Sequence, residues 1–299
     1  MKNIFSSILF ITLVLFTSFI LAFLVGNNSI GVDLWDSIIL KSWCLIFGVQ
    51  LVVFLPSFVF KTDHYFDITG GITFILMLML LTNSIISNDS SFFDPKLIPL
   101  FLISLWAVRL SSFLFLRVKR VGKDVRFDEI KTKFFRFMLA WIIQGFWVFM
   151  CLLPVITMVG SNKSTNLKFI AIGVLLWLVG WLVEVFSDIQ KTRFNSNLKF
   201  KGDFINTGLW SISRHPNYFG EFVLWTGITL IAFPTFSGFQ YLACLTPIFV
   251  YLLLNKISGI NLLEEIANKR WGDNHSYQEY KRNTPVFFPK IFKIWTKKK

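Results

Sequence analysis

Long apolar runs, separated by short polar connections, fill most of the sequence. Eight of these runs approach the ~20 residues that a helix needs to cross the hydrocarbon core of a bilayer. They cover residues 4–25, 37–60, 67–87, 97–117, 134–158, 167–188, 219–235 and 239–257. The pattern predicts an all-α fold, a polytopic membrane helical bundle with about eight transmembrane helices (seven or eight). The first run is interpreted as a retained helix rather than a cleaved signal peptide.

The composition excludes an ordinary soluble protein. Hydrophobic residues make up 54% of the 299 residues and charged residues only 16%, whereas a soluble domain carries roughly 25% charged residues. Cys44, Cys151 and Cys244 all fall in apolar runs. Their spacing predicts neither a disulfide framework nor a metal site.

Basic residues are concentrated in alternate connections. The net charge is +13, and Lys and Arg gather in the connections 118–133 and 189–218 and in the tail 258–299. The positive-inside rule assigns such segments to the cytoplasmic side, so both termini and any active face are expected to be cytoplasmic. No basic stripe stands apart from these connections, and nucleic acid is therefore not an expected partner. The membrane itself is left open between endoplasmic reticulum and bacterial inner membrane.

Ionisable residues in or beside the spans mark candidate chemistry, because burying them in a membrane is costly. In the stretch KTDHYFDITGG, Tyr65 and Asp67 offer a phenol and an acid to a substrate; the alternative is an interfacial loop of solvated charges. Arg109 lies about two helical turns inside its predicted span and needs an acid or an anion. A structural ion pair would satisfy it equally well.

Two acids follow at helical spacing in the sixth run. Glu184 and Asp188 are four residues apart, so they share a helix face. Asp188 is expected near the cytoplasmic end of its span, where the helix dipole disfavours an anion. A ligand or a cation is therefore implied, and Lys191 or Arg193 could supply the cation locally.

The stretch SRHPNYFGE, residues 213–221, combines more polar chemistry than a helix cap needs. Pro216 suits the first position of a helix, and a helix N-terminus favours anions. The planar guanidinium of Arg214 matches phosphate or carboxylate. Glu221 is expected to be buried with a partner. We expect these polar places to converge on a cytoplasm-facing cavity that takes a water-soluble cofactor and a lipid.

Several stretches carry a family resemblance. GLWSISRHPNYFGE, SGINLLEE and WGDNHSYQEYKRNTPVFFP resemble the steroid 5-alpha-reductase C-terminal-domain superfamily, and in particular its membrane branch with the RHPNYFGE signature. FDITGGITFI, LWAVRLSSFLFLR, VGKDVRFDEI and GWLVEVFSDIQKTRF extend the resemblance upstream. We therefore divide the chain into N-terminal transmembrane helices (1–60), a steroid-reductase-like membrane domain with the cofactor cavity (61–290) and a basic tail (291–299).

The resemblance implies an oxidoreductase that uses NADPH to reduce a double bond conjugated to a carbonyl in a lipid or steroid-like molecule from the bilayer. The positions matched to the nicotinamide and ribose end are Asp188, Asn217, Tyr218, Gly220 and Glu221. The candidates for the phosphates and adenosine are Arg214, His215, Arg270, Tyr277 and Tyr280. The expected catalytic residues are Asp67 or Tyr65 as proton donor, together with Glu221. Arg109 and Glu184 are expected to be substrate contacts or structural partners.

Two other functions remain open at this point. Isoprenylcysteine carboxyl methyltransferases, which use S-adenosylmethionine, share the RHP-x-Y-x-G core and a similar Glu-Glu tail. A non-enzymatic membrane protein is the third possibility, although the sequence shows no internal repeat of the kind that many transporters contain. The pattern does not distinguish a steroid from a fatty enoyl or polyprenyl lipid.

Overall fold

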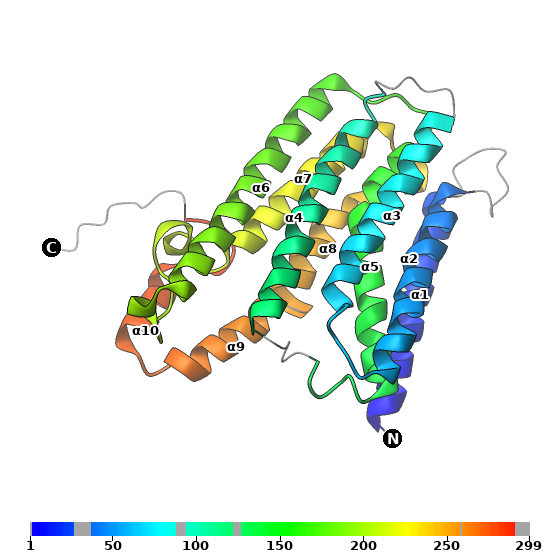
Figure 1. Cartoon of the computed structure of the whole chain (residues 1–299). Coiled ribbons are helices and arrows are strands. Elements are labelled where there is room, and N and C mark those ends of the chain that lie inside the picture. Colours follow the sequence, from blue (N-terminus) through cyan, green and yellow to red (C-terminus); the bar gives the residue numbers. More distant parts are fainter. Residues whose placement is uncertain (1, 27–36, 88–93, 122–126, 258, 291–299) are drawn as a thin grey trace. The chain divides into compact units, whose positions relative to one another are not determined.

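The computed structural model describes residues 2–26, 37–87, 94–121, 127–257 and 259–290, and within these ranges every regular element is a helix (Figure 1). The α-helices are α1 (Lys2–Gly26), α2 (Ile38–Val59), α3 (Phe66–Ser87), α4 (Leu97–Val121), α5 (Phe134–Val159), α6 (Leu167–Ser196), α7 (Pro216–Ala232), α8 (Leu245–Leu252), α9 (Ile260–Trp271) and α10 (His275–Asn283). Short 3-10 turns and one π-helical turn, Leu253–Ile257, connect them.

The all-helical, polytopic membrane fold is confirmed. Seven helical stretches of the described chain are long and apolar enough to cross a membrane: Ile4–Gly26, Ile38–Val59, Phe66–Ser87, Leu97–Leu116, Phe134–Val159, Leu167–Ser196 and Gly238–Trp271. The eighth predicted span, 219–235, corresponds to α7, which has 17 residues and starts earlier, at Pro216. Both termini can be cytoplasmic only with an even number of crossings, so that prediction requires α7 to cross as well.

One predicted boundary was wrong. The sixth span was expected to end at residue 188, but α6 continues for two more turns to Ser196, where Gln190 accepts a hydrogen bond from the backbone nitrogen of Leu209 and Lys191 lies over Trp210. The last span, predicted over 239–257, matches a 3-10 segment, α8 and the π turn, which together run from Gly238 to Ile257. By length and composition the candidate span also takes in α9, up to Trp271.

The chain divides into two compact units. The first contains residues 1–171 and 228–246, and the second contains 172–227 and 247–299. The predicted division at residue 60 stays a prediction, and the predicted tail 291–299 lies outside the described residues. In the first unit α5 is buried along most of its length and contacts α1, α2 and α3, as expected for a helix that is apolar on all sides. Phe137 and Trp141 of α5 form an aromatic cluster with Phe54 and Phe127.

Candidate functional site

Glycines bring α6 and α7 into backbone contact in the second unit. A Cβ atom on Gly220 would lie 2.5 Å from the carbonyl oxygen of Gly180 and 2.7 Å from the backbone nitrogen of Glu184. About two helical turns further along α7, a Cβ on Gly227 would lie 2.5 Å from the carbonyl oxygen of Gly173. Small residues permit such close helix approach. The structure thus gives Gly220 a packing role, and its predicted cofactor contact stays a prediction.

Three buried acids lie on this pair of helices. The exposed fractions of Glu184, Asp188 and Glu221 are 3%, 7% and 8%. The side-chain nitrogen of Asn217, in the first turn of α7, donates a hydrogen bond to Asp188 Oδ1 at 3.4 Å. The side-chain oxygen of Asn217 is buried and accepts no hydrogen bond within the described structure. It is therefore an open acceptor beside the acids.

Asp188 does not lie at the helix terminus where it was expected. Because α6 runs on to Ser196, the carboxylate lies two turns before the C-terminus, and the dipole argument for a nearby ligand loses its basis. Of the two local cations proposed as partners, Lys191 stacks its ammonium over the ring of Trp210 at 4.6 Å. Asn217 is a further partner of Asp188, as a hydrogen-bond donor.

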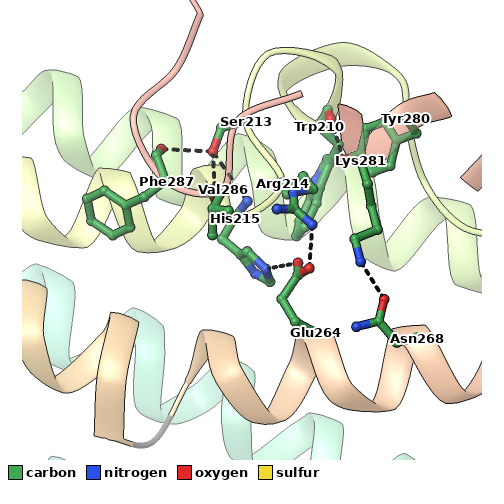
Figure 2. A network of polar contacts seen from close by, with 10 residues as sticks. All are labelled: Trp210, Ser213, Arg214, His215, Glu264, Asn268, Tyr280, Lys281, Val286 and Phe287. Atoms are coloured by element: carbon green, nitrogen blue, oxygen red, sulfur yellow. Dashed lines mark hydrogen bonds and ion pairs between the residues drawn. The ribbon is translucent and has the colours of Figure 1, made fainter. Parts of the chain in front are cut away.

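Glu264 contacts both Arg214 and His215 of the signature (Figure 2). Arg214 Nη1 donates a hydrogen bond to Glu264 Oε2, and His215 Nε2 lies 2.9 Å from Glu264 Oε1. Each carboxylate oxygen therefore serves one of two adjacent residues. Glu264 belongs to the quoted stretch SGINLLEE but was not predicted as a site residue. Because a buried arginine needs an acid, an acidic partner such as Glu264 was to be expected for Arg214 as it was for Arg109.

His215 is buried and uncharged at neutral pH. Burial lowers the pKa of His215 from its ordinary value, and the hydrogen bond with Glu264 opposes that shift without cancelling it. A neutral imidazole that donates from Nε2 to a carboxylate carries its lone pair on Nδ1. Nδ1 is buried and has no hydrogen-bond partner in the described structure. The imidazole ring also stacks on Tyr218, with 5.8 Å between ring centroids.

The C-terminal segment braces the loop that carries Arg214. The backbone nitrogen of Arg214 donates to the carbonyl oxygen of Pro285 at 2.9 Å, and the backbone nitrogen of Lys290 donates to the carbonyl oxygen of Ile212 at 2.9 Å. Ser213 Oγ donates to the carbonyl oxygen of Phe287 at 2.9 Å (Figure 2). These hydrogen bonds satisfy backbone groups of the loop that no helix pairs. They also hold the loop in one position before α7.

The remaining adenosine candidates have packing contacts. The Tyr280 hydroxyl donates to the carbonyl oxygen of Trp210 at 2.7 Å, and burial raises its pKa, so the hydroxyl stays protonated. Tyr277 is buried against Phe204. Arg270 stacks its guanidinium over Trp271 at 4.8 Å. Their assignment to a cofactor stays a prediction.

The three upstream candidates belong to the first unit. Asp67, in the first turn of α3, lines a cavity of about 40 Å³ together with Ser111 and Gln144. Tyr65 precedes α3 and is 58% exposed. The guanidinium of Arg109, in α4, lies 5.5 Å from the ring centroid of Phe113. Their predicted convergence with the signature residues stays a prediction, since those residues belong to the second unit.

The loop around Tyr65 is less solvated than the simpler interpretation assumed. Asp63 is buried, and Lys131 Nζ donates to its Oδ1 at 2.9 Å. This contact, together with the nearby Asp128, raises the pKa of Lys131. The segment before α3 is therefore anchored by a long-range ion pair.

Comparison with known proteins gives one family. A family model described as a protein of unknown function (DUF1295) matches residues 53–284. The matched range is more than half of the chain and contains all the candidate site residues described above. No curated protein and no solved structure matches the chain.

Proposed function

We propose that this chain, which belongs to the DUF1295 family of proteins of unknown function, is a multi-pass membrane enzyme that reduces an activated double bond of a lipid or steroid-like substrate with NADPH. The observation that carries the proposal is the group of three buried acids, Glu184, Asp188 and Glu221, beside the open acceptor of Asn217. Buried carboxylates in membrane helices are costly and generally mark function.

The polar groups around Asn217 fit the amide end of a nicotinamide. A carboxamide presents N–H donors and a carbonyl acceptor, and the open side-chain oxygen of Asn217 can accept one of those N–H groups. Asp188 holds the other end of the Asn217 amide and so orients that oxygen. Glu221, four residues further along α7, shares the face of Asn217 and is a second acceptor. NADPH, when bound, supplies the hydride; the residues supply orientation.

Family membership supports a reductase. The DUF1295 family falls in the steroid 5-alpha-reductase-like group, in agreement with the RHPNYFGE resemblance. Arg214 and His215 immediately precede α7 and both contact Glu264; we assign them to the phosphate-bearing part of the cofactor. Of the two predicted proton donors, Asp67 is favoured, because it lines a largely apolar cavity whereas Tyr65 is largely exposed.

The proposal includes a cytoplasmic active face. The signature loop and the C-terminal segment that braces it belong to the basic connections 189–218 and 258–299, which the positive-inside rule assigns to the cytoplasm. NADPH would then enter from the cytoplasm and the lipid from the bilayer. The membrane is that of the endoplasmic reticulum or the bacterial inner membrane.

One observation favours a second candidate function. Glu264, from the Glu-Glu tail element, holds Arg214 and His215 of the signature. Isoprenylcysteine carboxyl methyltransferases resemble this chain in both elements, so an S-adenosylmethionine-dependent methyl transfer to a lipidated carboxylate is the alternative.

Calorimetric titration of the detergent-purified protein with NADPH and with S-adenosylmethionine tests both proposals. We expect NADPH to bind, and Asn217→Ala to weaken that binding about tenfold, since one buried hydrogen bond is lost. Asn206→Ala, which changes an exposed asparagine of the same unit, is the matched control and should bind as the wild type does.

Binding of S-adenosylmethionine without NADPH would transfer the protein to the methyltransferase alternative. Binding of neither compound would contradict both. Equal NADPH affinity in Asn217→Ala and Asn206→Ala would mean that the acid cluster is not part of the cofactor site.

A further inference from the structure

A strongly basic depression lies on the second unit beside the signature loop. It has a volume of about 460 Å³, and its charged lining consists of Arg214, Lys281, Arg282 and Lys290. The other lining residues are polar or apolar and include the exposed Phe288. No carboxylate is among the described residues that line it.

The four cations come from two segments that are far apart in the sequence. Arg214 precedes α7, Lys281 and Arg282 are in the last turn of α10, and Lys290 follows it. The backbone bonds from Arg214 to Pro285 and from Lys290 to Ile212 hold these segments together. The tertiary structure therefore builds the depression, and its cations are positioned before any ligand arrives.

Local effects explain only part of this charge. The negative end of the α10 dipole favours Lys281 and Arg282, and Glu264 neutralises Arg214 in part. Lys281 Nζ donates to the amide oxygen of Asn268 at 2.6 Å, a neutral partner (Figure 2). Within the described chain, Lys281, Arg282 and Lys290 have no carboxylate at ion-pair distance. Like charges held side by side repel each other, and an anion would relieve that repulsion.

Arg214 has a further donor besides the one that Glu264 occupies. One of its terminal nitrogens is occupied by Glu264, whereas its Nε is buried and has no acceptor in the described structure. A guanidinium presents five N–H donors in a fork that matches the oxygens of a phosphate. The same residue thus links the depression to Glu264 and His215.

We propose that this depression binds a phosphate group, carried either by a nucleotide or by an anionic phospholipid. A phosphate matches the site in charge, since one or two negative charges meet four cations, and in geometry, since several oxygens meet Arg and Lys donors. Phe288 provides an apolar surface at the rim for the base or acyl part. Only the nucleotide source rests on the proposed function; phosphate binding itself does not.

Inorganic pyrophosphate is the probe for the test, titrated calorimetrically into the purified full-length protein. We expect the double variant Arg282→Gln/Lys290→Gln to weaken binding about tenfold or more, because two charge-assisted contacts are lost. Both side chains are exposed, so the variant should fold normally. Lys199→Gln/Lys201→Gln removes the same charge from exposed positions of the same unit and should bind as the wild type does. Added salt should weaken wild-type binding.

Competition then identifies the source of the phosphate. Displacement of pyrophosphate by NADPH, and less well by NADH, would assign the depression to the 2′-phosphate that distinguishes the two nucleotides. Displacement by dioctanoyl phosphatidic acid but by neither nucleotide would assign it to a lipid. Both results uphold the proposal.

Failure of this proposal is distinguishable from failure of the reductase. No pyrophosphate binding to the wild type, or equal loss in the two double variants, overturns the phosphate site. NADPH that still binds equally to both variants would then leave the reductase intact. Pyrophosphate binding that fails selectively in Arg282→Gln/Lys290→Gln, without any NADPH binding, would uphold the site and contradict the reductase.

Discussion

At the scale of single residues, Glu264 and Glu265 form a natural comparison. Glu264 accepts hydrogen bonds from Arg214 and His215, whereas the Glu265 side chain is 61% exposed and pairs with Lys269 at 2.7 Å, one helical turn away. Charge-assisted bonds in a half-buried network stabilise a protein far more than an exposed ion pair does. The two adjacent glutamates are therefore expected to contribute differently to the free energy of unfolding.

We expect Glu264→Gln to lower the free energy of unfolding by roughly 1.5–3 kcal/mol, since an amide leaves one of the two donors unsatisfied and Arg214 without its anion. Glu265→Gln should cost less than about 0.5 kcal/mol. Thermal unfolding in detergent measures both. Equal losses in the two variants would mean that the Glu264 contacts contribute no more than a surface pair.

The buried imidazole of His215 makes the stability of the protein depend on pH. Its folded pKa lies below the ordinary value because of burial, so below about pH 6.5 the unfolded chain binds a proton that the folded chain does not. This contribution is complete above about pH 6.5 and is lost as the pH falls, with a slope of at most ~1.4 kcal/mol per pH unit.

His215→Gln should remove that acid-side slope, and His275→Gln, at an exposed position of the same unit, should retain it. Unfolding temperatures measured between pH 5 and 8 provide the comparison. The same slope in both variants would show that other groups cause the acid sensitivity.

At the scale of elements, the contact between α6 and α7 depends on glycine. The backbone of α6 occupies the space where a side chain on Gly220 would lie. Gly48, in α2, is the opposite case, because a Cβ there meets no atom within 4 Å. The two helix glycines thus separate the effect of close packing from the helix propensity of the residue.

Gly220→Ala should therefore destabilise the protein by about 1–3 kcal/mol, since the helices must separate to admit the methyl group. It should also weaken cofactor binding, because Asp188 and Asn217 would move apart. Gly48→Ala should be neutral or stabilise by up to about 1 kcal/mol. Unfolding and NADPH titration of both variants measure these effects; a stable, fully binding Gly220→Ala protein would contradict the packing argument.

At the scale of the whole molecule, the number of crossings decides the topology. Seven helical stretches of the described chain qualify as spans by length and composition, and α7, with 17 residues at about 1.5 Å each, is about 26 Å long. That length falls just short of the ~30 Å hydrocarbon core. A modest local thinning of the bilayer would let α7 cross.

We expect reporters fused to the two termini to lie on the same, cytoplasmic side, because α7 completes an even number of crossings. Green fluorescent protein, which fluoresces in the cytoplasm, and alkaline phosphatase, which is active outside it, are suitable in a bacterial host. A fusion in the connection 160–166 is the control and should report the outer side. Termini on opposite sides would mean that α7 does not cross.

The sequence alone was informative wherever the physics is local. Run length predicted the membrane helices, because a span must match the bilayer. Pro216 predicted the start of α7, because proline suits the first helical position. The burial expected for Glu221 is confirmed as well. The end of α6 escaped prediction, because helices often continue beyond the membrane with polar residues on every face.

Only the tertiary structure decided which distant residues meet. Arg214 and Glu264 are 50 positions apart, and Gly220 meets Gly180 across two helices. The basic depression similarly combines Arg214 with the stretch 281–290. Helical periodicity relates residues within a few turns, but partners across the chain depend on how whole helices and loops pack. The sequence therefore determined a membrane-spanning helical protein with a polar signature. Packing decided that Arg214 and His215 of this signature contact Glu264, and that Arg214 lines a basic depression together with three further cations.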